Sequence, residues 1–209
     1  CIRDSKYPVE QVATPEGYAR NPELVINFYN ERRKQLLDVK PNAGHIGLAE
    51  LEKDFNVTVV TQNVDNLHER AGSTHVIHLH GELTKVCSSR DPYNPHFVKE
   101  LAPEEYEVKL GDKAGDGTQL RPFIVWFGES VPEIETAIRY VEKADIFVII
   151  GTSLNVYPAA GLLNYVPRAA EVYLIDPKPV DTHVMRPIHV IQKGASEGVK
   201  AVSYTHLRA

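Results

Sequence analysis

Two histidines at a strand end have the side-chain type and spacing for catalysis or metal binding. His78 and His80 lie two residues apart at the end of the predicted strand Val76–Leu79, and Gly81 follows them. Residues two apart in a β-strand point to the same face, so the pair could hold a metal ion or supply a general base. A metal site needs a third ligand, which the sequence does not identify. A histidine that is only hydrogen-bonded remains the alternative.

Polar residues follow two other apolar segments. Val57–Val60 leads into Thr61-Gln62-Asn63-Val64-Asp65-Asn66, and Ile146–Ile150 leads into Gly151-Thr152-Ser153. Ligands of open α/β sheets bind at the carboxyl ends of the strands. Glycine allows close backbone approach there, and hydroxyl groups bind phosphate or ribose. Polar loops with ordinary helix caps are the alternative interpretation.

An arginine interrupts an apolar row in the first long helical segment. Leu24, Phe28, Arg32 and Leu36 are spaced i, i+4, and Tyr29 lies three residues before Arg32. A guanidinium in an apolar row is unfavourable unless it meets an anion or reaches water. Arg32 therefore binds an anionic ligand, extends into solvent, or pairs with a structural acid such as Glu31 or Glu129.

The elements that must position these residues alternate between β-branched runs and amphipathic segments. Strands are predicted at Val57–Thr61, Val76–Leu79, Phe123–Phe127, Ile146–Ile150, Val172–Ile175 and His189–Ile191. Helices are predicted at Asn42–Asp54, Pro132–Lys143 and Pro158–Val166. The continuous apolar run Ile146–Ile150 predicts a central strand buried on both faces. The pattern predicts an α/β fold in which helices cover a parallel sheet.

Two segments do not fit this alternation. Residues 6–40 are predicted to be helical, with Asn21 as N-cap and Pro22 at the first helical position. Residues 84–118 are polar and indicate an insertion or a small subdomain.

Composition excludes several classes of protein. The 209 residues carry 23 Lys+Arg and 28 Asp+Glu, and this net charge of -5 argues against nucleic acid as an electrostatic partner. No apolar run approaches the roughly 20 residues of a membrane-spanning helix. Two cysteines are too few for a disulfide scaffold, so a cytoplasmic location is expected.

Five motifs follow one another along the chain: Thr61–His68, Ala71-Gly72, His78–Gly81, Val125–Glu129 and Gly151–Ala159. In their order and spacing they resemble the sirtuins, the NAD-dependent protein deacylases. The resemblance covers about residues 6–200 and implies one catalytic domain over residues 6–202 with a Rossmann-like parallel sheet and helices on both faces. Within it, residues 6–40 would form a helical acyl-pocket module, 41–83 and 119–202 the Rossmann-like core, and 84–118 a small inserted module.

The resemblance also implies roles for individual residues. His80 matches the general base that accepts a proton from a ribose hydroxyl of NAD, a task that suits imidazole at neutral pH. The implied NAD-binding residues are Gln62, Asn63, Val64, Asp65, Gly151, Thr152, Ser153, Asp176 and Ala195. The family usually has Asn near the place of Asp176, although a carboxylate could bind a ribose hydroxyl.

The implied substrate is an acylated lysine in a protein or peptide. Val125, Trp126, Phe127, Gly128 and Glu129 match a strand that pairs with the extended peptide by β-augmentation. The reaction would transfer the acyl group to ADP-ribose and release nicotinamide.

A further match concerns the acyl group. Tyr29-Asn30-Glu31-Arg32, followed by Pro41-Asn42-Ala43-Gly44-His45, resembles the branch that removes succinyl and malonyl groups. There the tyrosine hydroxyl and the arginine fork bind the distal carboxylate of the acyl chain, a geometry that lysine could not reproduce. The resemblance therefore implies a desuccinylase or demalonylase, with acetyl-lysine a weaker substrate.

The sequence departs from the family pattern in further ways. Zinc-bearing sirtuins have two Cys-x-x-Cys pairs before the Trp-Phe-Gly-Glu segment, whereas this interval holds only Cys87, so no zinc is predicted. The family's Gly-rich phosphate loop is also absent. Residues 1–5 and 203–209 are expected to be non-native tails, and the chain as given is expected to bind NAD poorly and to be poorly active.

Two other functions remain open. Attack on NAD by a different nucleophile would make the protein a mono-ADP-ribosyltransferase, and a truncated chain could be a non-catalytic module that binds NAD or acyl-peptides. The presence of His80 together with Asn63 and Asp65 favours chemistry over binding alone.

Overall fold

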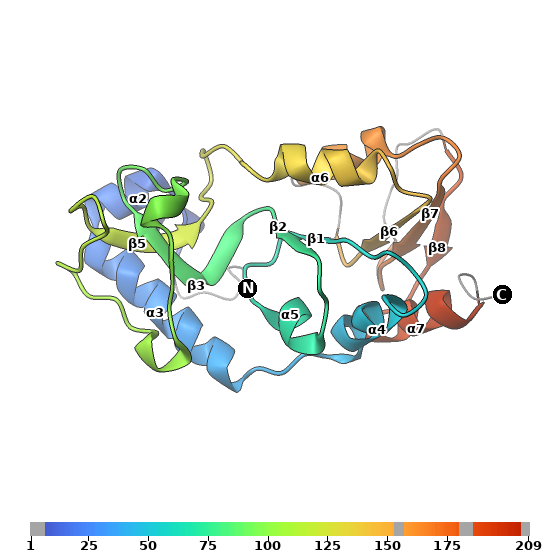
Figure 1. Cartoon of the computed structure of the whole chain (residues 1–209), viewed down its shortest axis with the longest axis horizontal. Helices are drawn as coiled ribbons and strands as arrows, with labels where there is room; N and C mark the ends of the chain where they lie inside the picture. The colour runs from blue at the N-terminus through green and yellow to red at the C-terminus, as the bar shows by residue number, and fades with distance from the viewer. Residues whose placement is uncertain (1–6, 153–156, 180–185, 206–209) are drawn as a thin grey trace. The chain divides into compact units, whose positions relative to one another are not determined.

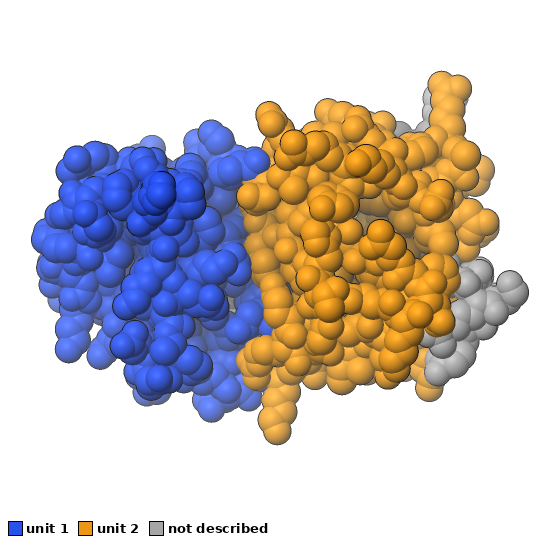
Figure 2. All heavy atoms as spheres, viewed as in Figure 1, with its two compact units in different colours: residues 1–39, 63–66, 80–132 blue, residues 40–62, 67–79, 133–209 orange. Residues whose placement is uncertain are grey.

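A computed structural model describes residues 7–152, 157–179 and 186–205 of the chain (Figure 1). The chain divides into two compact units (Figure 2). Unit 1 comprises residues 1–39, 63–66 and 80–132, and unit 2 comprises residues 40–62, 67–79 and 133–209. Each unit has a hydrophobic cluster of its own.

Unit 1 combines short helices with an antiparallel sheet of order β4-β3-β5. Its elements are α1 (Val9–Val12), α2 (Pro15–Arg20), α3 (Pro22–Asp38), β3 (Gly81–Ser88), η2 (Pro95–Phe97), β4 (Lys99–Glu100), η3 (Pro103–Glu105) and β5 (Leu120–Ile124). The helix α3 contacts both β3 and β5. Ile26 of α3 and Val86 of β3 meet Val108 in the buried cluster of this unit.

The start of α3 follows from its first two residues, as predicted. The Asn21 side chain accepts the backbone N–H of Leu24 at 3.1 Å, and Pro22 occupies the first helical position. This cap satisfies one of the N–H groups that a helix start leaves without an internal partner.

The antiparallel pair of β3 and β5 was not predicted. The expected insertion at 84–118 begins inside β3, which continues to Ser88. The expected strand Phe123–Phe127 is also wrong in its bounds, because β5 ends at Ile124. The chain turns after it: Gly128 adopts φ +91°, and the N–H of Glu129 donates to the carbonyl of Trp126 at 3.0 Å.

Unit 2 contains the parallel strands. Its elements are α4 (Ala43–Leu51), β1 (Val59–Thr61), α5 (Leu67–Ala71), β2 (Val76–His78), α6 (Ile134–Val141), β6 (Ile146–Ile150), η4 (Ala159–Tyr165), β7 (Glu171–Ile175), β8 (His189–Ile191) and α7 (Ala195–Thr205). β1 pairs with β2, and β6, β7 and β8 form a second parallel sheet in that order. Tyr173 and Ile175 of β7 pack against Val199 and Val202 of α7.

Most predicted elements of unit 2 are present, with two corrections. β6 has the predicted bounds, but it is an edge strand among the described residues and only Ile149 is buried, so the prediction of a central strand was wrong. The segment predicted as helix Pro158–Val166 is the 3-10 helix η4, in which the N–H of Gly161 bonds to the carbonyl of Pro158 at 2.9 Å. Within the described ranges, no helix has both the length and the apolar character to span a membrane.

Candidate active site

His80 lies in unit 1, immediately before β3, and is half-buried. Its carbonyl accepts the N–H of Val125 at 2.9 Å, which extends the pairing of β3 and β5. Gly81 adopts φ +83°, and a Cβ there would overlap the carbonyl oxygen of Phe123. Glycine is therefore required directly after His80, and the sharp turn fixes the backbone that carries the imidazole.

The loop after β1 is also held beside β3. The N–H of Leu83 donates to the carbonyl of Val64 at 2.7 Å, within unit 1. This bond places the segment Asn63–Asn66 next to the strand that follows His80. Unit 1 thus brings together the predicted base, the predicted residues Asn63, Val64 and Asp65, and the first residue of the predicted peptide-binding segment.

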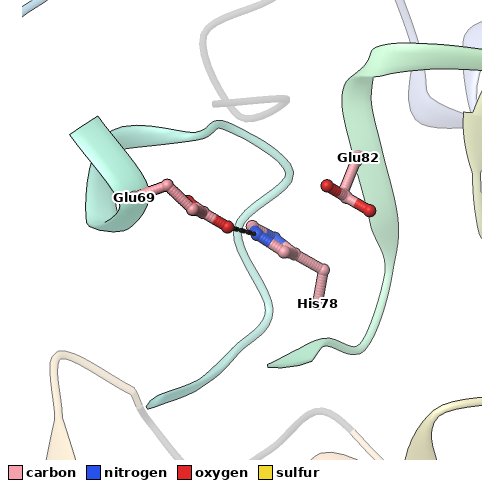
Figure 3. Close-up of side chains that lie close together, drawn as sticks. All are labelled: Glu69, His78 and Glu82. Atoms are coloured by element: carbon pink, nitrogen blue, oxygen red, sulfur yellow. Dashed lines mark hydrogen bonds and ion pairs between the residues drawn. The ribbon is translucent and has the colours of Figure 1, made fainter. Parts of the chain in front are cut away.

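His78 has a different environment from His80. Its ring is buried, and Nε2 lies 2.6 Å from Oε1 of Glu69 in α5, both in unit 2 (Figure 3). Because β2 ends at His78, strand alternation does not extend to His80. In the structure, His78 therefore bonds to a carboxylate, and it does not form a same-face pair with His80.

In unit 2, predicted NAD-binding residues collect at the carboxyl ends of parallel strands. Gly151 follows β6 and donates its N–H to the carbonyl of Ile175 in β7 at 2.9 Å. Asp176 follows β7, and its Oδ1 accepts the N–H of Lys178 at 2.8 Å. Thr152 is half-buried beside Gly151, whereas Ser153 lies outside the described residues. Gly151 and Asp176 therefore lie together at the carboxyl ends of these parallel strands, as predicted.

The remaining unit 2 residues are Gln62 and Ala195. Gln62 directly follows β1. Ala195 begins α7, which packs on α4, and a Cβ at Gly44 of α4 would lie 3.3 Å from the carbonyl carbon of Ala195. Gly44 therefore permits the close approach of the two helices at Ala195.

Each unit has one feature that fits the binding of a nucleotide group. A Cβ at Gly151, which has φ +60°, would meet no atom of the described residues within 4 Å, so these residues leave the space above this backbone open. The Oδ1 atom of Asn66 is buried and has no hydrogen-bond partner among the described residues. A buried acceptor without a partner indicates a missing ligand or water, and Asn66 adjoins the predicted residue Asp65.

Tyr29 and Trp126 form a buried pair in unit 1. The indole Nε1–H of Trp126 donates to the Tyr29 hydroxyl at 3.0 Å, and the two residues are 2% and 3% exposed, respectively. Burial raises the pKa of Tyr29 to about 12, so the phenol stays protonated at neutral pH. Since indole can only donate, the hydroxyl accepts from Trp126 and keeps its own proton for another acceptor.

Arg32 lies one turn after Tyr29 on α3 and is half-exposed. Its guanidinium carbon is 5.2 Å from the centroid of the Phe28 ring, and Nη1 donates to Oε1 of Gln35 at 3.4 Å. The charged group therefore lies over an aromatic face and reaches the surface of unit 1.

Glu129 is bound by Arg121, a residue that lies outside all of the sequence motifs. Arg121 donates from Nη1 and Nη2 to the two carboxylate oxygens at 2.7 and 3.0 Å, and the N–H of Trp126 donates to the same carboxylate at 2.8 Å. The Arg121 guanidinium also lies 3.6 Å from the Trp126 ring centroid. Glu129 therefore orders the segment after β5, and Arg121 is the arginine that binds both of its carboxylate oxygens.

Replacing Glu129 by glutamine should destabilise the protein by about 1–3 kcal/mol at pH 7, because a charge-assisted pair with buried Arg121 is lost. Burial alone would raise the pKa of Glu129, but the bonds from Arg121 and Trp126 outweigh it and lower the pKa. A depressed carboxyl pKa stabilises the fold above the unfolded value near 4.3, and this contribution disappears as pH falls through the folded pKa. The difference in unfolding free energy should therefore shrink in acid.

Urea unfolding at pH 7 and pH 3 measures both effects. Glu104→Gln is the matched control, since Glu104 is exposed in η3 of the same unit. Equal losses for the two variants would contradict a structural role for the Glu129 carboxylate.

A second buried network was also missed. Arg33 is 3% exposed, and burial lowers its pKa to about 10. It donates to the Tyr106 carbonyl at 2.7 Å and to Oδ1 of Asn30 at 2.6 Å, while Asn30 exchanges bonds of 2.8 and 2.9 Å with the backbone of Val108. Ile26, Asn30 and Arg33 share one helical face. The two polar residues on this face were the feature of the sequence that could have indicated the network.

Comparisons with known proteins agree with this geometry. Residues 5–158 match the Sir2 family. An NAD-dependent protein deacylase of Bacteroides thetaiotaomicron is 86% identical over 195 residues, which cover 93% of this chain and 83% of that protein. An NAD-dependent protein deacylase of Helicobacter pylori is 48% identical over 189 residues, or 90% of this chain and 80% of that protein.

Solved structures show the same likeness. A Sir2 homolog–NAD complex has a TM-score of 0.80 and 35% identity, covering 94% of this chain and 77% of that one. A Sir2–p53 peptide–NAD+ complex has a TM-score of 0.73 and 29% identity, covering 90% and 79%. The fold is the Rossmann-like α/β fold of these structures. The chain belongs to the Sir2 family, the sirtuins.

Proposed function

We propose that this sirtuin is an NAD-dependent protein-lysine deacylase that prefers succinyl- and malonyl-lysine over acetyl-lysine. The deacylase activity is supported by the 86% identical relative and by the position of His80 beside Val125 and the Asn63–Asn66 loop. The acyl preference rests on one observation: Tyr29, whose hydroxyl oxygen accepts a hydrogen bond from Trp126, lies one helical turn from Arg32.

The residues of each unit have separate tasks in this proposal. NAD, when bound, supplies the activated ribose from which nicotinamide departs. In unit 2, Gly151, Thr152, Asp176 and Ala195 would hold its ribose and phosphate groups. In unit 1, Asn63 and Asp65 would orient the nicotinamide end.

His80 would act as the proton acceptor. A neutral imidazole nitrogen takes the proton of the ribose hydroxyl that receives the acyl group, and the turn at Gly81 fixes its backbone. Orientation and one proton acceptor are the protein's contribution to the chemistry.

The peptide would lie along residues 125–129. The N–H groups of Val125, Trp126 and Phe127 already donate within unit 1, the last to the carbonyl of Ala13 at 3.0 Å. An added strand would therefore bond mainly to carbonyl oxygens of this segment, with Phe127, which is 60% exposed, beside it.

For the negatively charged acyl chains, Tyr29 and Arg32 would bind the distal carboxylate. The tyrosine donates its hydroxyl proton, and the guanidinium offers two parallel donors. A neutral acetyl group has no atom that uses either interaction.

One peptide sequence carrying succinyl-, malonyl- or acetyl-lysine tests the proposal. Each is incubated with NAD and a version of the protein that includes the family's Gly-rich phosphate loop, and free lysine peptide, acyl-ADP-ribose and nicotinamide are measured by mass spectrometry. We expect all three products, formed fastest from succinyl or malonyl peptide. Faster acetyl removal would overturn the acyl preference, ADP-ribose attached to protein would indicate a transferase, and no nicotinamide release would indicate a binding module.

A further inference from the structure

The small module, defined as residues 89–119 between β3 and β5, has no donor set that fits the zinc of zinc-bearing sirtuins. Cys87, at its edge, is fully buried, and burial raises the pKa of its thiol to about 12. Its Sγ donates to the carbonyl of Pro122 at 3.7 Å. Zinc binds thiolates, whereas this sulfur is a protonated donor in a β-strand. In the described part of unit 1, no three metal-ligating side chains converge.

Ser88, the last residue of β3, is instead the centre of a hydrogen-bond network. It is fully buried, and its Oγ accepts the N–H groups of Arg90 and Asp91, each at 3.0 Å. Its hydroxyl donates to Oδ2 of Asp116 at 2.7 Å. One side chain thus fixes the first turn of the module and connects it to the distant end.

Asp116 receives three donors. Besides Ser88 at Oδ2, the hydroxyl of Thr118 donates to Oδ1 at 2.7 Å and the N–H of Thr118 donates to Oδ1 at 3.0 Å. These bonds, together with the nearby charge of Arg90, lower the pKa of Asp116 to about 2. The carboxylate is therefore ionised at neutral pH, and each of its oxygens is held by a hydroxyl group.

The network lies where both ends of the module leave the sheet. Ser88 pairs with Leu120 across β3 and β5, and the N–H of Ser89 donates to the carbonyl of Gln119 at 3.1 Å. The same two strands continue to Gly81 and Ile124, next to His80. The hydrogen bonds that join the two ends of the module therefore also fix one end of the β3–β5 pair, whose other end lies next to His80.

We propose that Ser88, Asp116 and Thr118 form a metal-independent clamp that closes the small module in place of a structural zinc ion. A zinc centre joins two chain segments through thiolates around one cation. Here the Asp116 carboxylate accepts two hydroxyl groups and one backbone N–H, and the Ser88 hydroxyl oxygen accepts two further backbone N–H groups from the other segment. The clamp needs no metal because every polar group in it has a donor or acceptor partner.

The test combines metal removal with substitution in the full chain. The protein is dialysed against a chelator, its zinc content is measured by elemental analysis, and its thermal midpoint is compared before and after. Ser88→Ala, Asp116→Asn and the double variant are then measured. Asp112→Asn is the matched control, because Asp112 lies in the same module and its carboxylate accepts the N–H of Lys109 in an exposed turn.

We expect sub-stoichiometric zinc and an unchanged midpoint after chelation. Ser88→Ala and Asp116→Asn should each lower the midpoint by about 4–8 °C, and the double variant by little more than one of them, because both remove the same network. Asp112→Asn should lower it by less than about 2 °C. One zinc per chain whose removal lowers the midpoint would overturn the proposal, as would clamp variants that match the control.

Hydrogen exchange of the unmodified protein covers the case of variants that fail to fold. The amides of Arg90, Asp91 and Thr118 should be protected, since each donates within the clamp. Exchange of these three amides at the rate of an unprotected chain would show that the clamp does not form.

Discussion

Replacing His80 by alanine should lower kcat/KM for deacylation by about 10²–10⁴-fold, the usual contribution of a positioned general base. Alanine removes the proton acceptor but leaves the backbone bond from the Val125 N–H to the His80 carbonyl. The fold and the affinity for NAD should therefore change little. Initial rates with succinyl peptide, together with NAD binding by calorimetry, measure the two quantities separately.

His96→Ala is the control for this experiment, because His96 has an exposed side chain in the same unit. It should retain the parent rate. If His80→Ala kept turnover within about tenfold of the parent, His80 would not be the base. If it lost NAD binding instead, the histidine would be a binding residue and the assignment of its role would be wrong.

Local rules of sequence account for part of the fold. The start of α3 at Pro22 and the strand Ile146–Ile150 were predictable because a cap, a proline and a continuous apolar run each act over a few adjacent residues. The grouping of Gly151 and Asp176 also followed, because parallel strands place their carboxyl ends together.

The unpredicted features depend on contacts between distant residues. β3 was missed because its pairing with β5 joins Gly81 to Ile124, and nothing local to Gly81–Ser88 specifies that partner. The buried-face prediction for β6 failed for a related reason, since strand order decides which strand lies at an edge. Composition alone does not contain strand order.

The residues of the candidate site also fall into two groups: those that local motifs identify and those whose role depends on distant contacts. His80 and the segment Asn63–Asn66 could be named from contiguous motifs. Arg121 could not be identified in this way, because its role depends on contacts with Glu129 and the Trp126 ring. These contacts form only when the chain turns after β5. The clamp at Ser88 was equally hidden, since its carboxylate comes from Asp116.

The proposed acyl-binding residues combine local and long-range information. The spacing of Tyr29 and Arg32 is a local helical fact, but the bond from Trp126 to Tyr29 joins residues 97 positions apart. That bond occupies the hydroxyl oxygen as an acceptor, so the proton of Tyr29 remains to be donated. A carboxylate placed between this hydroxyl and the Arg32 guanidinium would receive a neutral and a charge-assisted hydrogen bond.

Replacing Arg32 by methionine should therefore remove roughly 1.5–3 kcal/mol of transition-state stabilisation for succinyl peptide, the range for hydrogen bonds to a charged group, because Arg32 is half-exposed. This corresponds to a loss of about 10- to 150-fold in kcat/KM. Acetyl-lysine turnover should fall far less, because a neutral acyl chain makes no contact that needs the guanidinium. The measured quantity is the ratio of kcat/KM for succinyl and acetyl versions of one peptide.

Two further variants separate charge, geometry and fold. Arg32→Lys keeps the charge but not the fork, so its succinyl-to-acetyl ratio should lie between those of the parent and Arg32→Met. Arg20→Met removes an exposed arginine at the end of α2 in the same unit, and its ratio should equal that of the parent. Equal losses on succinyl and acetyl peptides for Arg32→Met would show that Arg32 supports the helix rather than the substrate, and the preference for acidic acyl groups would have to be abandoned.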